Sequence, residues 1–108
     1  MNFTVVLTDR AARELEETAR WWAENRSTME AERWYTAFLQ AIFSLERNPE
    51  RCAFARENGK LPYEVRQLTF GLGRRFTHRA VLTIRDDIVV ILSIRHLAQQ
   101  DIATDEVE

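Results

Sequence analysis

Hydrophobic spacing differs between two long parts of this chain, and the difference restricts the folds it can adopt. Between residues 9 and 47, apolar residues recur every three or four positions, which predicts amphipathic helices over residues 9–26 and 28–47. From residue 63 the apolar runs are shorter and rich in β-branched residues, which is typical of strands. The predicted strands are residues 63–70, 75–84 and 88–94. Since helices and strands of this kind each leave an apolar face, the two groups are expected to pack together.

Local signals set the ends of the two helices. Thr8 or Asp9 offers an N-cap oxygen for the first helix, and Ser27 or Thr28 offers one for the second. The Asn-Pro pair at 48–49 ends the second helix, because the residue before a proline is disfavoured in helical geometry. Two helices joined by so short a turn form an antiparallel hairpin.

The remaining segments complete the topology. A β-type run over residues 3–8 precedes the helices, and residues 50–62 are expected to form a loop. The order β-α-α-β-β-β predicts an α+β fold, an antiparallel sheet covered on one face by the helix hairpin. With 108 residues, one domain is expected over 1–108, with residues 98–108 as an acidic C-terminal tail.

Composition excludes several classes of protein. The single cysteine, Cys52, excludes an internal disulfide and a cysteine-based zinc site. No apolar run is long enough for a membrane span, and the N-terminal residues lack the features of a signal peptide, so a cytoplasmic protein is expected. The adjacent Asp86 and Asp87 are interpreted as turn formers, and neither a metal nor another cofactor is expected.

Charge is unevenly distributed, although the net charge is only −2. Residues 62–97 carry six arginines against three acids, Glu64, Asp86 and Asp87, which gives a local balance of +3. Fourteen of the 15 basic residues are arginine. The planar guanidinium fork suits phosphate or carboxylate groups, although a GC-rich genome explains this usage equally well.

Two positions in the strands require an explanation. Arg79 interrupts an apolar strand, and an unpaired buried charge is costly, so it needs either an ion pair with a helix glutamate or a functional role. The last strand ends in Arg95 and His96, of which His96 has a pKa near neutrality. Adjacent strand residues point to opposite faces, so these two side chains are not expected to share one site.

Aromatic and imidazole groups elsewhere are interpreted mainly as packing residues. Trp21, Trp22 and Trp34 have helical spacing and are expected in the core, with Trp21 the most exposed of the three. A base-stacking platform is the alternative. His78, beside Arg79, is also expected to pack rather than to act chemically.

Four strings, taken in order, resemble the RelE/ParE superfamily of bacterial toxins from type II toxin–antitoxin modules. They are "VVLTDRAARELEETARWWAENRS", "AERWYTAFLQAIFSLERNPERC", "YEVRQLTFG" and "HRAVLTIRDDIVVILSIRH". No single string is decisive, but their order and spacing span about residues 4 to 97. The resemblance implies a toxin that a cognate antitoxin silences. RelE-like members cut mRNA in the ribosomal A site, whereas ParE-like members poison DNA gyrase without being nucleases.

The resemblance also implies candidate residues. For a nuclease, the candidate catalytic residues are Arg66, Arg79 and His96, and the candidate phosphate- or target-binding residues are Arg74, Arg75 and Arg95. Three positions depart from the nuclease pattern: Glu64 stands where some members have Lys, and Leu97 and Ala103 stand where members have Arg, His or Tyr. A ParE-like gyrase poison is therefore expected, with a ribosome-dependent mRNA endonuclease and an inert binding module as alternatives.

The partner is expected to be an acidic, partly disordered antitoxin that covers exposed basic residues of the sheet. It is expected to bind the sheet edge and the groove beside the helices. A homodimer, formed through the helix hairpin or an unpaired strand, or a hetero-oligomer with the antitoxin is the further alternative.

Overall fold

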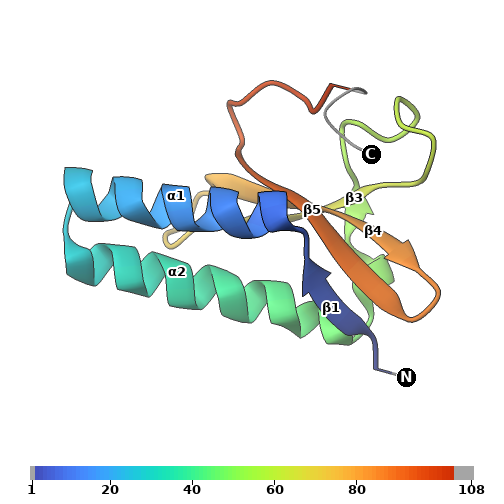
Figure 1. Cartoon of the computed structure of the whole chain (residues 1–108), viewed down its shortest axis with the longest axis horizontal. Helices are drawn as coiled ribbons and strands as arrows, with labels where there is room; N and C mark the ends of the chain where they lie inside the picture. Colours follow the sequence, from blue (N-terminus) through green and yellow to red (C-terminus); the bar gives the residue numbers. More distant parts are fainter. Residues whose placement is uncertain (1, 104–108) are drawn as a thin grey trace.

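A computed structural model of the chain describes residues 2–103 (Figure 1). The elements are β1 (Thr4–Leu7), α1 (Asp9–Asn25), α2 (Thr28–Phe43), 3₁₀ turns at Ser44–Glu46 and Pro49–Arg51, β2 (Ala53–Phe54), β3 (Arg66–Phe70), β4 (His78–Arg85) and β5 (Ile88–His96). The predicted α+β class and the order of helices and strands are confirmed. The short strand β2 lies inside the region predicted to be a loop, and β3 and β4 each begin three residues later than predicted.

The helix starts follow the predicted capping signals. The Thr8 side chain accepts a hydrogen bond from the Ala11 backbone N–H, and the Ser27 side chain accepts one from Glu30, both at 3.0 Å. The second helix ends at Phe43, earlier than predicted, and the chain continues as 3₁₀ turns. Asn48, immediately before Pro49, has a left-handed backbone with φ of 52°.

The sheet has the strand order β1-β5-β4-β3-β2. Strands β2 to β5 pair antiparallel as predicted, whereas β1 pairs parallel with β5, so the sheet is mixed. No hairpin turn connects β1 to β5, because the helices and three other strands lie between them in sequence. The antiparallel rule for hairpins therefore does not apply to this pair.

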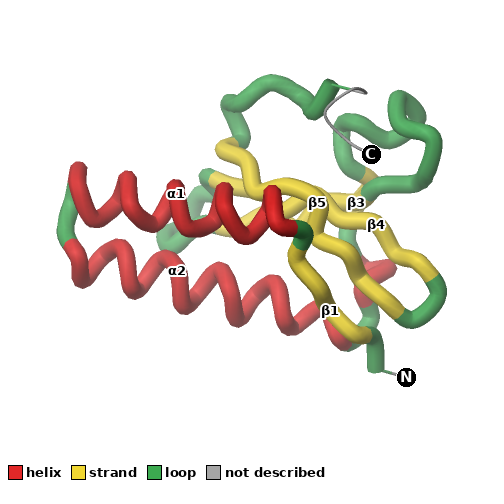
Figure 2. The backbone as a smooth tube through the Cα atoms, in the orientation of Figure 1, coloured by secondary structure: helices red, strands yellow, loops and turns green. Residues whose placement is uncertain are grey.

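The sheet separates two hydrophobic cores. The helix-side core contains Trp34, Phe38 and Ile42 of α2 packed on strand residues such as Leu82 and Ile91. Figures 1 and 2 show the helices side by side, with the loop after β2 and the segment after β5 close to each other elsewhere on the sheet. These two segments cover a smaller core on the far face, made of Ala55, Leu61, Val65, Val81 and Ile102.

A β-bulge in β5 changes which side chains face the helices. Val81 pairs with Ser93 and Leu82 pairs with Ile91, which leaves Leu92 as the extra residue. Ile91 and Ile94 therefore both belong to the helix-side core, although their spacing is odd. Among residues 2–103, no helix is long and apolar enough to cross a membrane.

Candidate functional site

Arg79, the predicted mid-strand charge, is completely buried on the far face of the sheet. Its Nη1 donates to Glu57 Oε1 at 2.8 Å and to Gln67 Oε1 at 3.1 Å, and its Nη2 donates to Glu57 Oε2 at 2.6 Å. The predicted requirement for an acidic partner is thus met, but the partner lies in the loop after β2 and not on a helix. Glu57 was not singled out from the sequence, because nothing marked which of many acids would fold onto Arg79.

The Glu57 carboxylate also holds the C-terminal segment. The Ile102 backbone N–H donates to Glu57 Oε2 at 2.9 Å. Burial acts to raise the pKa of Glu57, but the hydrogen bonds from Arg79 and Ile102 outweigh it and lower that pKa to about 2. Glu57 is therefore ionised at neutral pH and ties β4, its own loop and the C-terminal segment together.

Arg95 is the second basic residue on the far face, and it pairs directly across the strands with Arg79. Only 4% of it is exposed. Its Nε and Nη2 donate to the Gln100 carbonyl oxygen at 3.1 and 2.6 Å, and its Nη1 donates to Ser93 Oγ at 3.4 Å. The fork that was predicted to hold a phosphate instead holds the backbone that follows β5.

Two exposed basic residues tie the same segment to the loop after β2. Arg56 forms an ion pair with Asp101 at 3.1 Å and donates to the carbonyls of Leu97 and Gln99. Lys60 also pairs with Asp101, at 3.2 Å. The far face is therefore closed by a network of internal charges. The tail acids Asp105, Glu106 and Glu108 lie outside the described residues.

Arg66 lies on the other face of the sheet, since it pairs with Leu82 of the helix-side core. Its Nη1 donates to the carbonyls of Glu50 and Cys52 at 3.0 and 2.7 Å, and its guanidinium lies over the Phe54 ring. Arg66 thereby fixes the turn that leads into β2. Because Arg79 points to the opposite face, the structure does not bring the candidate catalytic residues together.

His96 and His78 face the helix side and pair directly across β4 and β5, with ring centroids 5.1 Å apart. His78 is 7% exposed and packs against Trp34, which confirms its expected packing role. Burial, and secondarily the charge of His96, lower the pKa of His78 to about 4. His96 is exposed, and its Nδ1 accepts the Ala98 backbone N–H at 3.0 Å. A neutral His96 ring therefore carries its proton on Nε2.

A groove of about 680 Å³ lies between α1 and the ends of β4 and β5. Its lining combines the apolar and aromatic side chains of Trp21, Trp22 and Ile94 with polar and charged ones, namely Glu14, Glu17, Thr18, Arg26, Thr77, His78, His96 and Gln99. Trp21 is 53% exposed and contacts Trp22 edge to face, whereas Trp34 is fully buried, which confirms the expected difference among the tryptophans.

Glu14 of α1 closes one wall of this groove. Its Oε1 accepts hydrogen bonds from Ser93 Oγ at 2.8 Å and from the Ile94 backbone N–H at 3.0 Å. These groups lie on β5 beyond the end of β1, where the strand would otherwise present an open edge. Sequence reasoning missed this residue, because one glutamate on a charged helix face gives no signal of such a contact.

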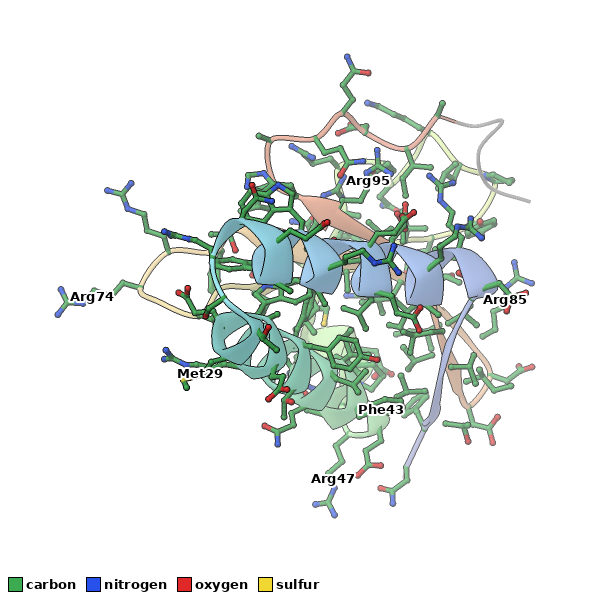
Figure 3. The ribbon with its side chains drawn as sticks, turned by 60° about the vertical axis from the view of Figure 1, so that its left-hand side comes forward. Met29, Phe43, Arg47, Arg74, Arg85 and Arg95 are labelled. Carbon is green, nitrogen blue, oxygen red and sulfur yellow. The ribbon has the colours of Figure 1, made fainter. Side chains whose placement is uncertain are left out.

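The remaining candidates, Arg74 and Arg75, lie in the loop between β3 and β4 and are exposed. In Figure 3, Arg74 points away from the body of the molecule, whereas Arg95 lies within it. Among residues 2–103, no group of three or more His, Cys, Asp or Glu side chains is arranged to hold a metal ion.

Comparison with known proteins places this geometry in context. The family model described as the ParE toxin of the type II toxin–antitoxin system, parDE, matches residues 5–101. Among curated proteins, no sequence matches this chain.

Two solved structures are similar in fold. A chain of the chromosomal ParDE toxin–antitoxin system from P. aeruginosa is 19% identical with a TM-score of 0.71, covering 87% of this chain and 95% of that one. A chain of the RelBE2 toxin–antitoxin complex from Mycobacterium tuberculosis is 23% identical with a TM-score of 0.54, covering 89% of this chain and 99% of that one.

Proposed function

Since this chain belongs to the ParE toxin family of type II toxin–antitoxin systems, we propose that it arrests growth by binding DNA gyrase and not by cutting RNA. This membership confirms the resemblance seen in the sequence, and the question that remains is the target. The proposal places the chain in the cytoplasm, where gyrase acts.

One observation carries the choice of target: three of the basic residues implied for a nuclease, Arg66, Arg79 and Arg95, are occupied by internal partners. RNA cleavage needs cations that stabilise the developing charge on the phosphorane, together with an acid and a base. Arg79 is neutralised by Glu57, and Arg95 is bound to the Gln100 carbonyl. Arg66 is bound to backbone carbonyls. None of these three guanidinium groups is free to meet a phosphate.

The residues at the end of β5 also favour gyrase over RNA as the target. His96 is exposed, but the two candidate cations on the paired strands β4 and β5, Arg79 and Arg95, point to the opposite face. Leu97, the next residue, extends the β4–β5 pairing through a hydrogen bond from its N–H to the Thr77 carbonyl and has no ionisable group. A lone imidazole is insufficient for phosphodiester cleavage, whereas binding to a protein target requires no such constellation.

The proposed partner is a cognate antitoxin, and the groove beside α1 is the proposed docking surface. Of the basic sheet residues that an antitoxin was expected to cover, Arg79 and Arg95 are buried within the chain itself. The groove instead offers aromatic walls, with Trp21 half exposed at its edge. The two similar folds come from proteins described as a ParDE system and a RelBE2 complex, which supports a protein partner.

Two assays on the wild-type protein test the target. We expect the purified chain to inhibit supercoiling by gyrase, and we expect mRNA in cells that express it to remain uncut. The cognate antitoxin, added at equal concentration, should restore supercoiling. Codon-phased mRNA cuts that disappear in the His96→Ala variant, with normal supercoiling, would establish the alternative, a ribosome-dependent endonuclease.

A further inference from the structure

The loop that joins β3 to β4, residues 71–77, has a backbone fixed by its own contacts. The Thr77 N–H donates to the Phe70 carbonyl at 2.9 Å and closes the loop, and Leu72 packs against the helix-side core. A Cβ added to Gly71 would lie 2.0 Å from the Arg75 carbonyl oxygen, so the chain crosses itself too closely for any other residue there. The loop is therefore formed before any partner binds.

The tip of this loop presents hydrogen-bond donors and one aromatic ring. Arg74 and Arg75 are exposed, and neither guanidinium has a hydrogen-bond or ion-pair partner among residues 2–103. Phe76, next in sequence, is 62% exposed. The one hydroxyl of the loop, Thr77 Oγ1, is already hydrogen-bonded to His78 Nδ1 at 2.8 Å. The tip therefore offers donors and a ring face, without a free side-chain acceptor.

The positive charge of the loop is not offset by acidic residues in the two strands that flank it. No acidic residue lies between Glu64 and Asp86, although the whole chain has a net charge of −2. This local positive field, which is not shared by the rest of the chain, attracts a polyanion to one end of the molecule. The two helices, by contrast, carry many glutamates.

We propose that this loop contacts DNA, with Arg74 and Arg75 on phosphates and Phe76 stacked on an accessible base. A DNA backbone presents acceptors only, which matches a tip whose free side-chain groups are donors, whereas a protein surface presents donors and acceptors together. Arginine forks bind phosphate, and an exposed aromatic ring stacks on unpaired bases. The consequence of this contact rests on the proposed gyrase target: a toxin that binds gyrase would then contact the enzyme and its DNA at the same time.

The direct test measures binding of the purified chain to a fluorescently labelled single-stranded oligodeoxynucleotide at several salt concentrations, with a matched duplex for comparison. The double variant R74Q/R75Q should weaken binding and reduce the salt slope by about 1.4, because two phosphate contacts contribute about 0.7 each. Phe76→Ala should weaken binding roughly fivefold or more through lost stacking. The control R33Q/R47Q removes two exposed arginines from elsewhere on the chain and should bind like wild type.

A second pair of variants tests the shape of the loop without changing its charge. Gly71→Ala should weaken DNA binding, because the added methyl group forces the loop open. Gly73→Ala is the matched control, since a Cβ there has nothing within 4 Å. Equal DNA binding by wild type and R74Q/R75Q, or none by wild type, would overturn the proposed contact.

The gyrase target is tested separately, by capture of gyrase in the absence of DNA and by the amount of cleaved DNA trapped. R74Q/R75Q should still capture gyrase but trap less cleaved DNA. Loss of gyrase capture by this variant would mean that the loop contacts protein, and would overturn the DNA contact. If wild type captures no gyrase while the loop variants lose DNA binding, the DNA contact stands and the proposed gyrase target fails.

Discussion

Polar side chains on the far face of the sheet are buried and bound within the chain, whereas polar and aromatic side chains at the helix-side end of the sheet are exposed. On the far face, Arg79 and Arg95 are buried, and each is bound to a group from the chain itself. At the helix-side end, His96, Trp21 and Arg74 are exposed, and a groove opens between α1 and the strand ends. The difference shows that a charged residue on a toxin sheet is not evidence of a site until its partners are known.

The largest effect is expected from stranding a charge on the far face. Glu57→Ala leaves Arg79 buried without an acid, so the free energy of unfolding should fall by about 3–5 kcal/mol. The matched control is Glu64→Ala, because the Glu64 side chain is 61% exposed and its ion pair with Arg66 should contribute less than about 1 kcal/mol. Urea denaturation of both variants measures this, and equal stabilities would show that the buried pair is not what holds the far face.

The helix side should instead respond to acid through His78. Its pKa is lowered from 6.5 to about 4 in the folded chain, so the unfolded chain binds a proton first as the pH falls. The free energy of unfolding should therefore fall by roughly 3 kcal/mol as the pH is lowered from 6.5 to 4. Unfolding free energies across this range give the slope, and Glu57 should add a second loss between pH 4.5 and 2.

Two substitutions test whether His78 causes this pH dependence of the free energy of unfolding. His78→Phe should remove the loss between pH 6.5 and 4, because the buried imidazole that causes it is gone. His96→Gln should keep most of it, since burial of His78 is the larger cause of the shift. An unchanged slope in His78→Phe would assign the titration to another residue.

A smaller effect is expected at the groove, and only when the antitoxin is present. Trp21→Ala should weaken antitoxin binding by about 2 kcal/mol while leaving the fold stable, because its half-exposed ring lines the proposed docking surface. Met29→Ala is the control, since Met29 is 79% exposed and does not line this groove. Calorimetric titration with the cognate antitoxin measures both, and equal affinities would place the antitoxin elsewhere.

The smallest effect is expected for His96. If the chain acts by binding gyrase, His96→Ala should leave growth arrest nearly unchanged, because its imidazole has no reaction to serve. Growth curves after induction test this directly. Complete loss of toxicity in a stably folded variant would restore His96 as a catalytic residue.

The sequence predicted the elements of the fold well, because periodicity and capping are local signals. The N-cap residues Thr8 and Ser27 are examples, since each hydrogen-bonds three residues ahead. The parallel pairing of β1 was not predicted, because strand order at a sheet edge depends on packing between distant segments.

The candidate site was predicted only in part, for the same reason. The sequence indicated that Arg79 needs a partner, but the choice of Glu57 depends on how a loop folds over the sheet. The bulge at Leu92 places Ile91 and Ile94 on one face, against simple alternation. The contact between Glu14 and Ile94 joins residues that lie 80 positions apart, beyond the reach of any local pattern.

Arg79 is assigned here to holding the fold together, with no part in chemistry, and one double variant tests that assignment most directly. Arg79→Met combined with Glu57→Gln removes both charges, and the oxygen of the new side-chain amide can still accept the Ile102 N–H, so no buried charge is stranded. We predict that this double variant folds, inhibits gyrase and arrests growth like wild type. A folded double variant that no longer arrests growth would contradict the assignment and return Arg79 to a functional role.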